Sequence, residues 1–154
     1  MKIVNGDLIK LALNGQFDVI IHGCNCYCTM GAGIAKAVKT QFPEAYAVDC
    51  ETEKGSKNKL GTYSSASVTR EGHSITIVNG YTQHHYRRVG GKGINADYDA
   101  IRAVFKAVRH DFSGKTIGYP RIGAGLAGGD WTIIADIINE ELEGENHTLV
   151  EFSP

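Results

Sequence analysis

The sequence predicts an α/β fold: a three-layer α/β/α sandwich with a mixed, mostly parallel central sheet. Short β-branched segments alternate along the chain with segments whose apolar residues have helical spacing. Only one pair of expected strands is consecutive, so most strands are joined by helical crossovers, which produce parallel pairs. No linker or low-complexity tract interrupts residues 1–154, and we expect them to form a single domain.

The first half of the chain alternates strand and helix. The expected strands are residues 2–4 and 17–21, and the expected helices are residues 8–13, 33–42 and 44–53. The segment 17–21 is short and β-branched, and Gly23 ends it. Pro43 stops the helix before it and is suited to the first turn of the helix after it.

The second half contains the consecutive strand pair. After a polar loop at 55–58, the expected strands are residues 61–68, 74–81, 115–119 and 147–152, and the expected helices are residues 97–110 and 130–142. A turn around Arg70-Glu71-Gly72-His73 joins the paired strands. Apolar residues of the helix 97–110 fall on one stripe, as in a helix that covers a core.

Composition and charge exclude several classes of protein. Sixteen basic and seventeen acidic residues leave a net charge of -1, so we expect no extended nucleic-acid partner. No apolar run approaches the roughly 18 residues of a membrane span, and the N-terminus has no signal-peptide core, so we expect a cytoplasmic protein without a membrane partner. Without a secretory signal, Cys24, Cys26, Cys28 and Cys50 are expected to be free thiols, and their C-x-C-x-C spacing is unlike that of zinc sites. We expect no metal or cofactor, and near-zero charge leaves the oligomeric state open.

Two glycine-rich segments share the pattern apolar-Gly-Ala-Gly-apolar-Ala, at residues 30–35 and 122–127. Each follows an expected strand and precedes an expected helix. Without a Cβ, several N–H groups can turn toward one anion, and a helix start adds a positive dipole end. The pair therefore predicts a site for two phosphates or one diphosphate at the carboxyl ends of the strands. The alternative is two tight turns that bind nothing.

Other phosphate-binding motifs fit poorly. Lys36 stands where G-x-G-x-x-G requires its third glycine, and no G-x-x-x-x-G-K-[ST] occurs. The run Gly90-Gly91-Lys92-Gly93 is predicted to be a surface loop.

These features resemble the macrodomains, a family that binds ADP-ribose and its derivatives, along almost the whole chain. The resemblance is carried by Gly6-Asp7 and by residues 21–35, 78–83 and 120–126. Residues 30–35 and 120–126 are similar to the subgroup that contains the terminal ADP-ribose protein glycohydrolases. Residues 21–26 and Phe42-Pro43-Glu44-Ala45 are more similar to the ADP-ribose 1″-phosphate phosphatases of that subgroup.

The resemblance implies a role for each matching residue. Asp7 would accept a hydrogen bond from the adenine amino group, and Asn25 would face the distal ribose. The two turns would hold the diphosphate and distal ribose through Gly31, Ala32, Gly33, Ile34, Gly123, Ala124, Gly125 and Leu126. Alternatively, Asp7 caps the following helix and Asn25 stabilises its own turn.

Departures from the subgroup bear on the reaction. Its glycohydrolases use a lysine, which aligns near Gln83, and an aspartate, which aligns with Ala127. Neither residue present can do that chemistry, and Asp130 is typical of a helix N-cap. These departures count against the lysine-dependent mechanism.

His22 ends a buried strand beside Asn25 and is the leading candidate for a general acid or base. The alternative is a buried, hydrogen-bonded histidine. His84 and His85 are expected in a surface loop, and the alternative is a position at the same pocket. Tyr81 and Tyr86 are aromatic residues available to cover the ligand, as is Trp131, which is expected more often in the core.

The leading hypothesis is an ADP-ribose 1″-phosphate phosphatase with a small-molecule substrate and His22 and Asn25 as catalytic residues. The alternatives are a non-catalytic ADP-ribose-binding module and an ADP-ribosyl hydrolase acting on protein or nucleic acid.

Overall fold

The computed structural model describes residues 1–86 and 93–153, and it contains a six-stranded sheet. The strands are β1 (Lys2–Gly6), β2 (Val19–Cys24), β3 (Tyr63–Arg70), β4 (His73–Tyr81), β5 (Ile117–Tyr119) and β6 (His147–Phe152). Their order across the sheet is β1-β6-β5-β2-β4-β3. All neighbouring pairs are parallel except β3 with β4. The carboxyl ends of five strands therefore meet at one edge.

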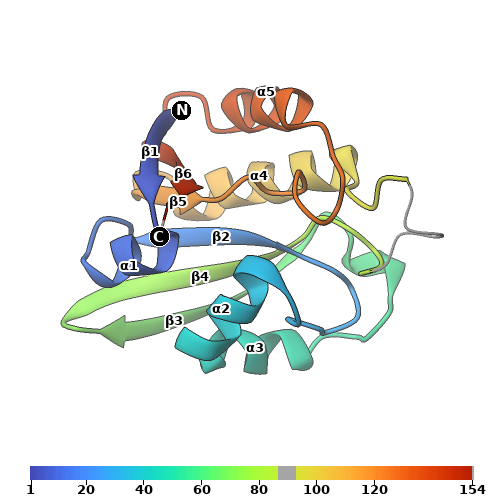
Figure 1. Ribbon diagram of the computed structural model, residues 1–154, viewed down its shortest axis with the longest axis horizontal. Coiled ribbons are helices and arrows are strands. Elements are labelled where there is room, and N and C mark those ends of the chain that lie inside the picture. Colours follow the sequence, from blue (N-terminus) through green and yellow to red (C-terminus); the bar gives the residue numbers. More distant parts are fainter. Residues whose placement is uncertain (87–92, 154) are drawn as a thin grey trace.

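Helices cover both faces of the sheet (Figure 1). They are α1 (Leu8–Leu13), α2 (Gly33–Gln41), α3 (Pro43–Cys50), the short 3-10 helix η1 (Lys57–Lys59), α4 (Tyr98–Phe112) and α5 (Trp131–Glu141). The helices α4 and α5 lie on one face, and α1, α2 and α3 pack on the other. The predicted α/β/α sandwich with a mixed sheet is confirmed.

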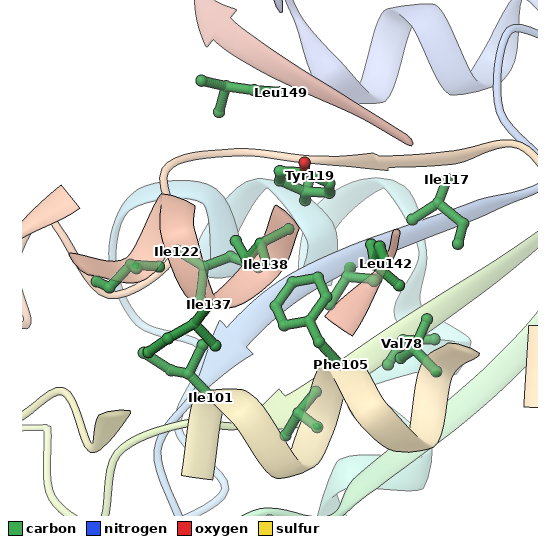
Figure 2. Close-up of a cluster of buried hydrophobic side chains, with 14 of the residues drawn as sticks. Val78, Ile101, Phe105, Ile117, Tyr119, Ile122, Ile137, Ile138, Leu142 and Leu149 are labelled. Carbon is green, nitrogen blue, oxygen red and sulfur yellow. The ribbon is translucent and has the colours of Figure 1, made fainter. Parts of the chain in front are cut away.

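The core has one apolar layer on each face of the sheet. Figure 2 shows the layer under α4 and α5, where Phe105 of α4 and Ile138 of α5 lie near Tyr119 of β5. Alternation along β2 divides its side chains between the layers: Ile21 belongs to the α4–α5 layer and Ile20 to the α1–α3 layer. The same alternation decides which way the last residues of β2 point.

Most predicted elements match those of the structure within a few residues. The hairpin turns at Glu71 and Gly72, which have φ values of 52° and 80°, the conformation that a two-residue type I′ turn requires. The buried strand was predicted at residues 17–21, whereas β2 begins two residues later, at Val19, and ends three residues later, at Cys24. The polar loop predicted at 55–58 overlaps η1, which begins at Lys57 and ends one residue beyond the loop, at Lys59. Residues 90–92 of the predicted glycine loop lie outside the described residues.

Two further findings concern the classes considered from composition. All four cysteines are free. Within the described residues, none of the helices has the length and apolar character to cross a bilayer.

Candidate functional site

Four connecting segments meet at the carboxyl edge of the sheet. Asp7 follows β1, residues 25–32 follow β2, residues 82–86 follow β4 and residues 120–130 follow β5. Because β2 and β5 are adjacent and parallel, the two glycine turns lie side by side at this edge, although they are about ninety residues apart in the sequence. This is the position where open α/β sheets bind ligands.

The first glycine turn leads directly into α2, and the start of that helix has no side-chain cap. Its N-cap residue is Ala32, whose side chain cannot accept a hydrogen bond. In contrast, α1, α4 and α5 are each capped by an aspartate: Asp7, Asp97 and Asp130. The first amides of α2 therefore lack the side-chain partner that α1, α4 and α5 have, and they suit an anion.

The second glycine turn differs from the prediction in its relation to the helix. α5 begins only at Trp131, and its amide end is capped by Asp130, so this turn gains no helix dipole. The turn is closed by a 2.7 Å hydrogen bond from the Gly129 N–H to the Gly123 carbonyl. Gly123 has a φ of 75°, which favours glycine. The Asp130 cap itself is confirmed.

Both turns line one cavity of about 620 Å³. The predicted binding residues of the two turns that line it are Gly31, Ala32, Gly33, Ile34, Gly123, Gly125 and Leu126. Ala124 does not line it, because its side chain packs against the core. Among the described lining residues there is no carboxylate, and the one cationic side chain, Arg121, is held by Glu151 at 2.7 Å. The polar groups that line the cavity are therefore main-chain groups and neutral side chains such as Asn25, Thr29 and Gln83.

A second cavity, of about 540 Å³, adjoins the first at Gly33. Asp7 lines it together with residues of α1 and α2. Oδ1 of Asp7 accepts hydrogen bonds from the N–H groups of Ile9 and Lys10, at 3.0 and 3.2 Å. The expected alternative, a helix cap, is therefore present. Neither bond uses Oδ2, so the cap leaves one carboxylate oxygen for another donor.

Asn25 is buried at the floor of the first cavity, and its amide group shapes the loop that carries it. Its Oδ1 accepts a hydrogen bond from the Tyr27 N–H at 2.8 Å, and its Nδ2 donates to the Thr29 hydroxyl at 2.8 Å. Asn25 and Thr29 both line the cavity. The turn-stabilising alternative is thus observed together with the position facing the cavity.

His22 does not lie where a direct role in proton transfer requires it. Its side chain is only 1% exposed, and it is not among the lining residues, although Gly23, Cys24 and Asn25 are. Its Nε2 lies 2.7 Å from Oδ1 of Asn79. Burial lowers the pKa of His22 to about 4, and the bond with Asn79 only partly opposes this shift. The structure therefore favours the alternative of a buried, hydrogen-bonded histidine.

The aromatic residues divide between core and rim. Tyr81 is buried, and its hydroxyl donates to Asp49 at 2.7 Å, so it is not available to cover a ligand. Tyr86 lines the cavity and is 46% exposed. Its ring stacks on His85, with the ring centres 4.6 Å apart, and His85 in turn contacts Tyr27 at 4.7 Å. The predicted surface histidines thus belong to an aromatic group beside the cavity.

Gln83 and Ala127 also line the cavity, as the alignment with the glycohydrolases implied. Gln83 donates from its Nε2 to the His85 carbonyl at 2.8 Å, and Ala127 has no group that exchanges a proton. The site therefore lacks the lysine and the acid at the two positions where that mechanism would use them.

A family model for the Macro domain matches residues 21–138, and the chain therefore belongs to the macrodomain family. The matched segment includes the end of β2, both glycine turns and most of α5. The resemblance stated from the sequence is confirmed.

Two relatives cover nearly the full chain. An uncharacterized 17.5 kDa protein from the tk-vs intergenic region of Enterobacteria phage T4 is 33% identical over 159 residues, covering 100% of this chain and 97% of its own. An ADP-ribose 1″-phosphate phosphatase of Debaryomyces hansenii is 24% identical, covering 91% of this chain and 93% of its own.

Two solved structures share the fold at 19% identity. The macrodomain of Mycobacterium tuberculosis DarG has a TM-score of 0.74 and covers 99% of this chain and 97% of its own. Thermosipho africanus DarTG in complex with ADP-ribose has a TM-score of 0.71 and covers 99% of this chain and 42% of its own.

Proposed function

We propose that this chain binds ADP-ribose derivatives and hydrolyses ADP-ribose 1″-phosphate to ADP-ribose and phosphate. The observation that carries the proposal is the uncapped start of α2, which faces the second glycine turn across one cavity. A cavity lined by amides, with no carboxylate among its described lining residues, suits a diphosphate. Membership of a family that includes an ADP-ribose complex and a phosphatase supports the choice of ligand.

The two adjoining cavities determine which end of the ligand would lie in each. Adenine would occupy the second cavity, where Oδ2 of Asp7 accepts a hydrogen bond from its amino group. The diphosphate would cross at Gly33, which lines both cavities, and receive N–H groups from both turns. The distal ribose would then lie in the first cavity beside Asn25.

The reaction requires water to attack phosphorus as the bond to the 1″ oxygen breaks. One proton of the water ends on the departing 1″ oxygen and the remaining hydroxyl stays on phosphorus, so the products are ADP-ribose and inorganic phosphate. Fixed amides would stabilise the charge that develops on the phosphoryl oxygens, and Asn25 would orient the distal ribose. Because His22 lies behind the lining, we propose that it holds the end of β2 in place.

One observation favours a second candidate, hydrolysis of ADP-ribose from protein or nucleic acid. Leu126 and Tyr86, at the rim of the first cavity, are 74% and 46% exposed. A phosphate at the 1″ position gains nothing from such apolar neighbours, whereas a larger attached group would cover them. A lysine-independent mechanism would then be required.

The test is to incubate the protein separately with ADP-ribose 1″-phosphate, an ADP-ribosylated protein and an ADP-ribosylated oligonucleotide. The proposal predicts phosphate release from the first, reduced at least tenfold in Asn25→Ala. ADP-ribose release from either macromolecule alone would favour the second candidate. Calorimetric binding of ADP-ribose without any product would identify a binding module instead.

A further inference from the structure

Lys59 is a buried lysine directly beneath the loop that follows β2. Its side chain is 7% exposed, and its Nζ donates to the Cys26 carbonyl at 3.1 Å. The ammonium also lies 3.7 Å from Sγ of Cys28 and 4.6 Å from the ring centre of Tyr81. All three contacts hold the lysine against the loop and the end of β4.

Burying the Lys59 ammonium costs desolvation free energy, which indicates that the residue has a role other than packing. Among the described residues, Lys59 has no carboxylate within the 4.0 Å of an ion pair. The neighbouring acid is Asp49, which is buried and accepts a hydrogen bond from Tyr81. An apolar side chain of similar volume would avoid the desolvation of an ammonium, so the charge contributes little to stability.

The loop that Lys59 contacts carries one end of the proposed ligand site. The main chain of Cys26 is fixed on both sides: its N–H donates to the His84 carbonyl at 2.9 Å, and its carbonyl accepts from the Gly55 N–H at 2.6 Å and from Lys59. Asn25, which lines the cavity, immediately precedes Cys26 in the chain. Lys59 is therefore one residue removed from the side chain proposed to meet the distal ribose.

The same loop has a conformation that needs external support. Cys28 has a φ of 57°, in the left-handed region that side chains other than glycine rarely adopt. Its Sγ donates to the Asp49 carbonyl at 3.2 Å, on the side of the loop where Lys59 lies. Residues 26 and 28 are thus both tied to the segment 49–59, and Lys59 supplies the charged contact.

We propose that Lys59 is a positioning residue that holds the loop of residues 25–29 so that Asn25 faces the distal ribose of the ligand. The inference rests on the proposed function, because it assigns that ribose to the first cavity. It predicts an effect that depends on the ligand: loss of Lys59 weakens binding of ADP-ribose but spares ADP, which has the adenosine and diphosphate and lacks the distal ribose.

The experiment compares Lys59→Met with Lys57→Met by calorimetry, using ADP-ribose and ADP as ligands. Lys57 lies on the same 3-10 turn and is exposed, so its variant loses the same charge without touching the loop. We expect Lys59→Met to bind ADP-ribose about tenfold more weakly, the loss of one charge-assisted hydrogen bond. Binding of ADP should change by less than about twofold, and Lys57→Met should bind both ligands like the wild type.

Three results would overturn the inference: unchanged ADP-ribose binding in Lys59→Met, equal weakening for both ligands, or the same selective loss in Lys57→Met. If Lys59→Met does not fold, the same comparison is made with Lys59→Gln, which keeps a neutral hydrogen-bond donor. Failure of both variants to fold would also overturn the inference, because Lys59 would then be structural.

If the proposed function is wrong, the wild type itself will bind neither ligand, and this result differs from every result that would overturn the inference about Lys59. In that case hydrogen exchange decides the inference by itself. Lys59→Met should exchange the amides of residues 25–29 faster than the wild type, while Lys57→Met does not. Unchanged exchange in this loop would overturn the positioning role.

Discussion

The imidazole Nε2 of His22 donates a hydrogen bond to Oδ1 of Asn79 across the parallel strands β2 and β4, at 2.7 Å. The direction follows from Nδ2 of Asn79, which donates to the Ala45 carbonyl at 2.9 Å and to the Ser64 hydroxyl at 3.0 Å, so that Oδ1 faces the ring. The ring thus donates from Nε2 inside the sandwich, and burial, which lowers the pKa of His22 to about 4, keeps it neutral near pH 7.

This neutral state predicts that acid destabilises the fold. The pKa of His22 is about 4 in the folded chain and about 6.5 when unfolded, so only the unfolded chain takes up this proton as the pH falls between those values. Above pH 6.5 this group does not reduce the free energy of unfolding, and by pH 5 it has lowered that free energy by about 2 kcal/mol. Urea unfolding at pH 7 and pH 5 should show this loss in the wild type and a smaller one in His22→Gln. An identical loss in both proteins would contradict the assignment.

The two roles of Asp7 are separable by substitution. Asp7→Ala removes the α1 cap and should cost about 1 kcal/mol of unfolding free energy, whereas Asp7→Ser retains an oxygen acceptor and most of that stability. Both variants should bind ADP-ribose more weakly, because both lose the carboxylate. Thermal unfolding measures the first effect and calorimetry the second. If Asp7→Ser bound like the wild type, the carboxylate would serve only as a cap.

Gly123 is constrained by its backbone and by its neighbours. Its φ is 75°, and an added Cβ would lie 3.1 Å from Cδ1 of Ile134 and 3.2 Å from Cδ1 of Ile101. Gly123→Ala should therefore destabilise the fold by about 2 kcal/mol. Gly125→Ala is the matched control, since its Cβ would meet nothing within 4 Å and its φ is not in the left-handed region. Equal unfolding midpoints in urea would refute the argument.

Asn25→Asp tests whether the cavity is built for a negatively charged ligand. An aspartate can still accept the hydrogen bond from the Tyr27 N–H, but it loses the donor to Thr29 and places a negative charge at the cavity floor. We expect ADP-ribose to bind at least tenfold more weakly, and adenosine to bind unchanged. Comparable weakening for both ligands would show that the loop, rather than the charge, had been disturbed.

The sequence predicted the features that depend on local pattern. The alternation of strands and helices, the hairpin at Glu71-Gly72, the Asp130 cap and the convergence of the two glycine turns all follow from residue periodicity or from turn and cap chemistry. These features are local, or they follow from the rule that parallel strands share their carboxyl edge.

What could not be predicted depends on which face of the sheet a residue occupies. His22 shares its face with Ile20, on the side of β2 that α1–α3 cover, so it lies behind the cavity and not in it. Tyr81 ends β4 at the same edge but points into the buried group around Cys24. Lys59 lies in a polar segment rich in lysine, and only the folding of the loop over it makes it buried.

The most direct test of the central claim is calorimetric titration of ADP-ribose into the wild type, Gly31→Val and Gly125→Val. A Cβ at either glycine would meet no protein atom within 4 Å and would project into open space at the cavity, so both variants should fold normally. If the two turns hold one diphosphate, each substitution alone should weaken binding by at least tenfold. Wild-type affinity in either variant, or no binding by the wild type, would contradict the account.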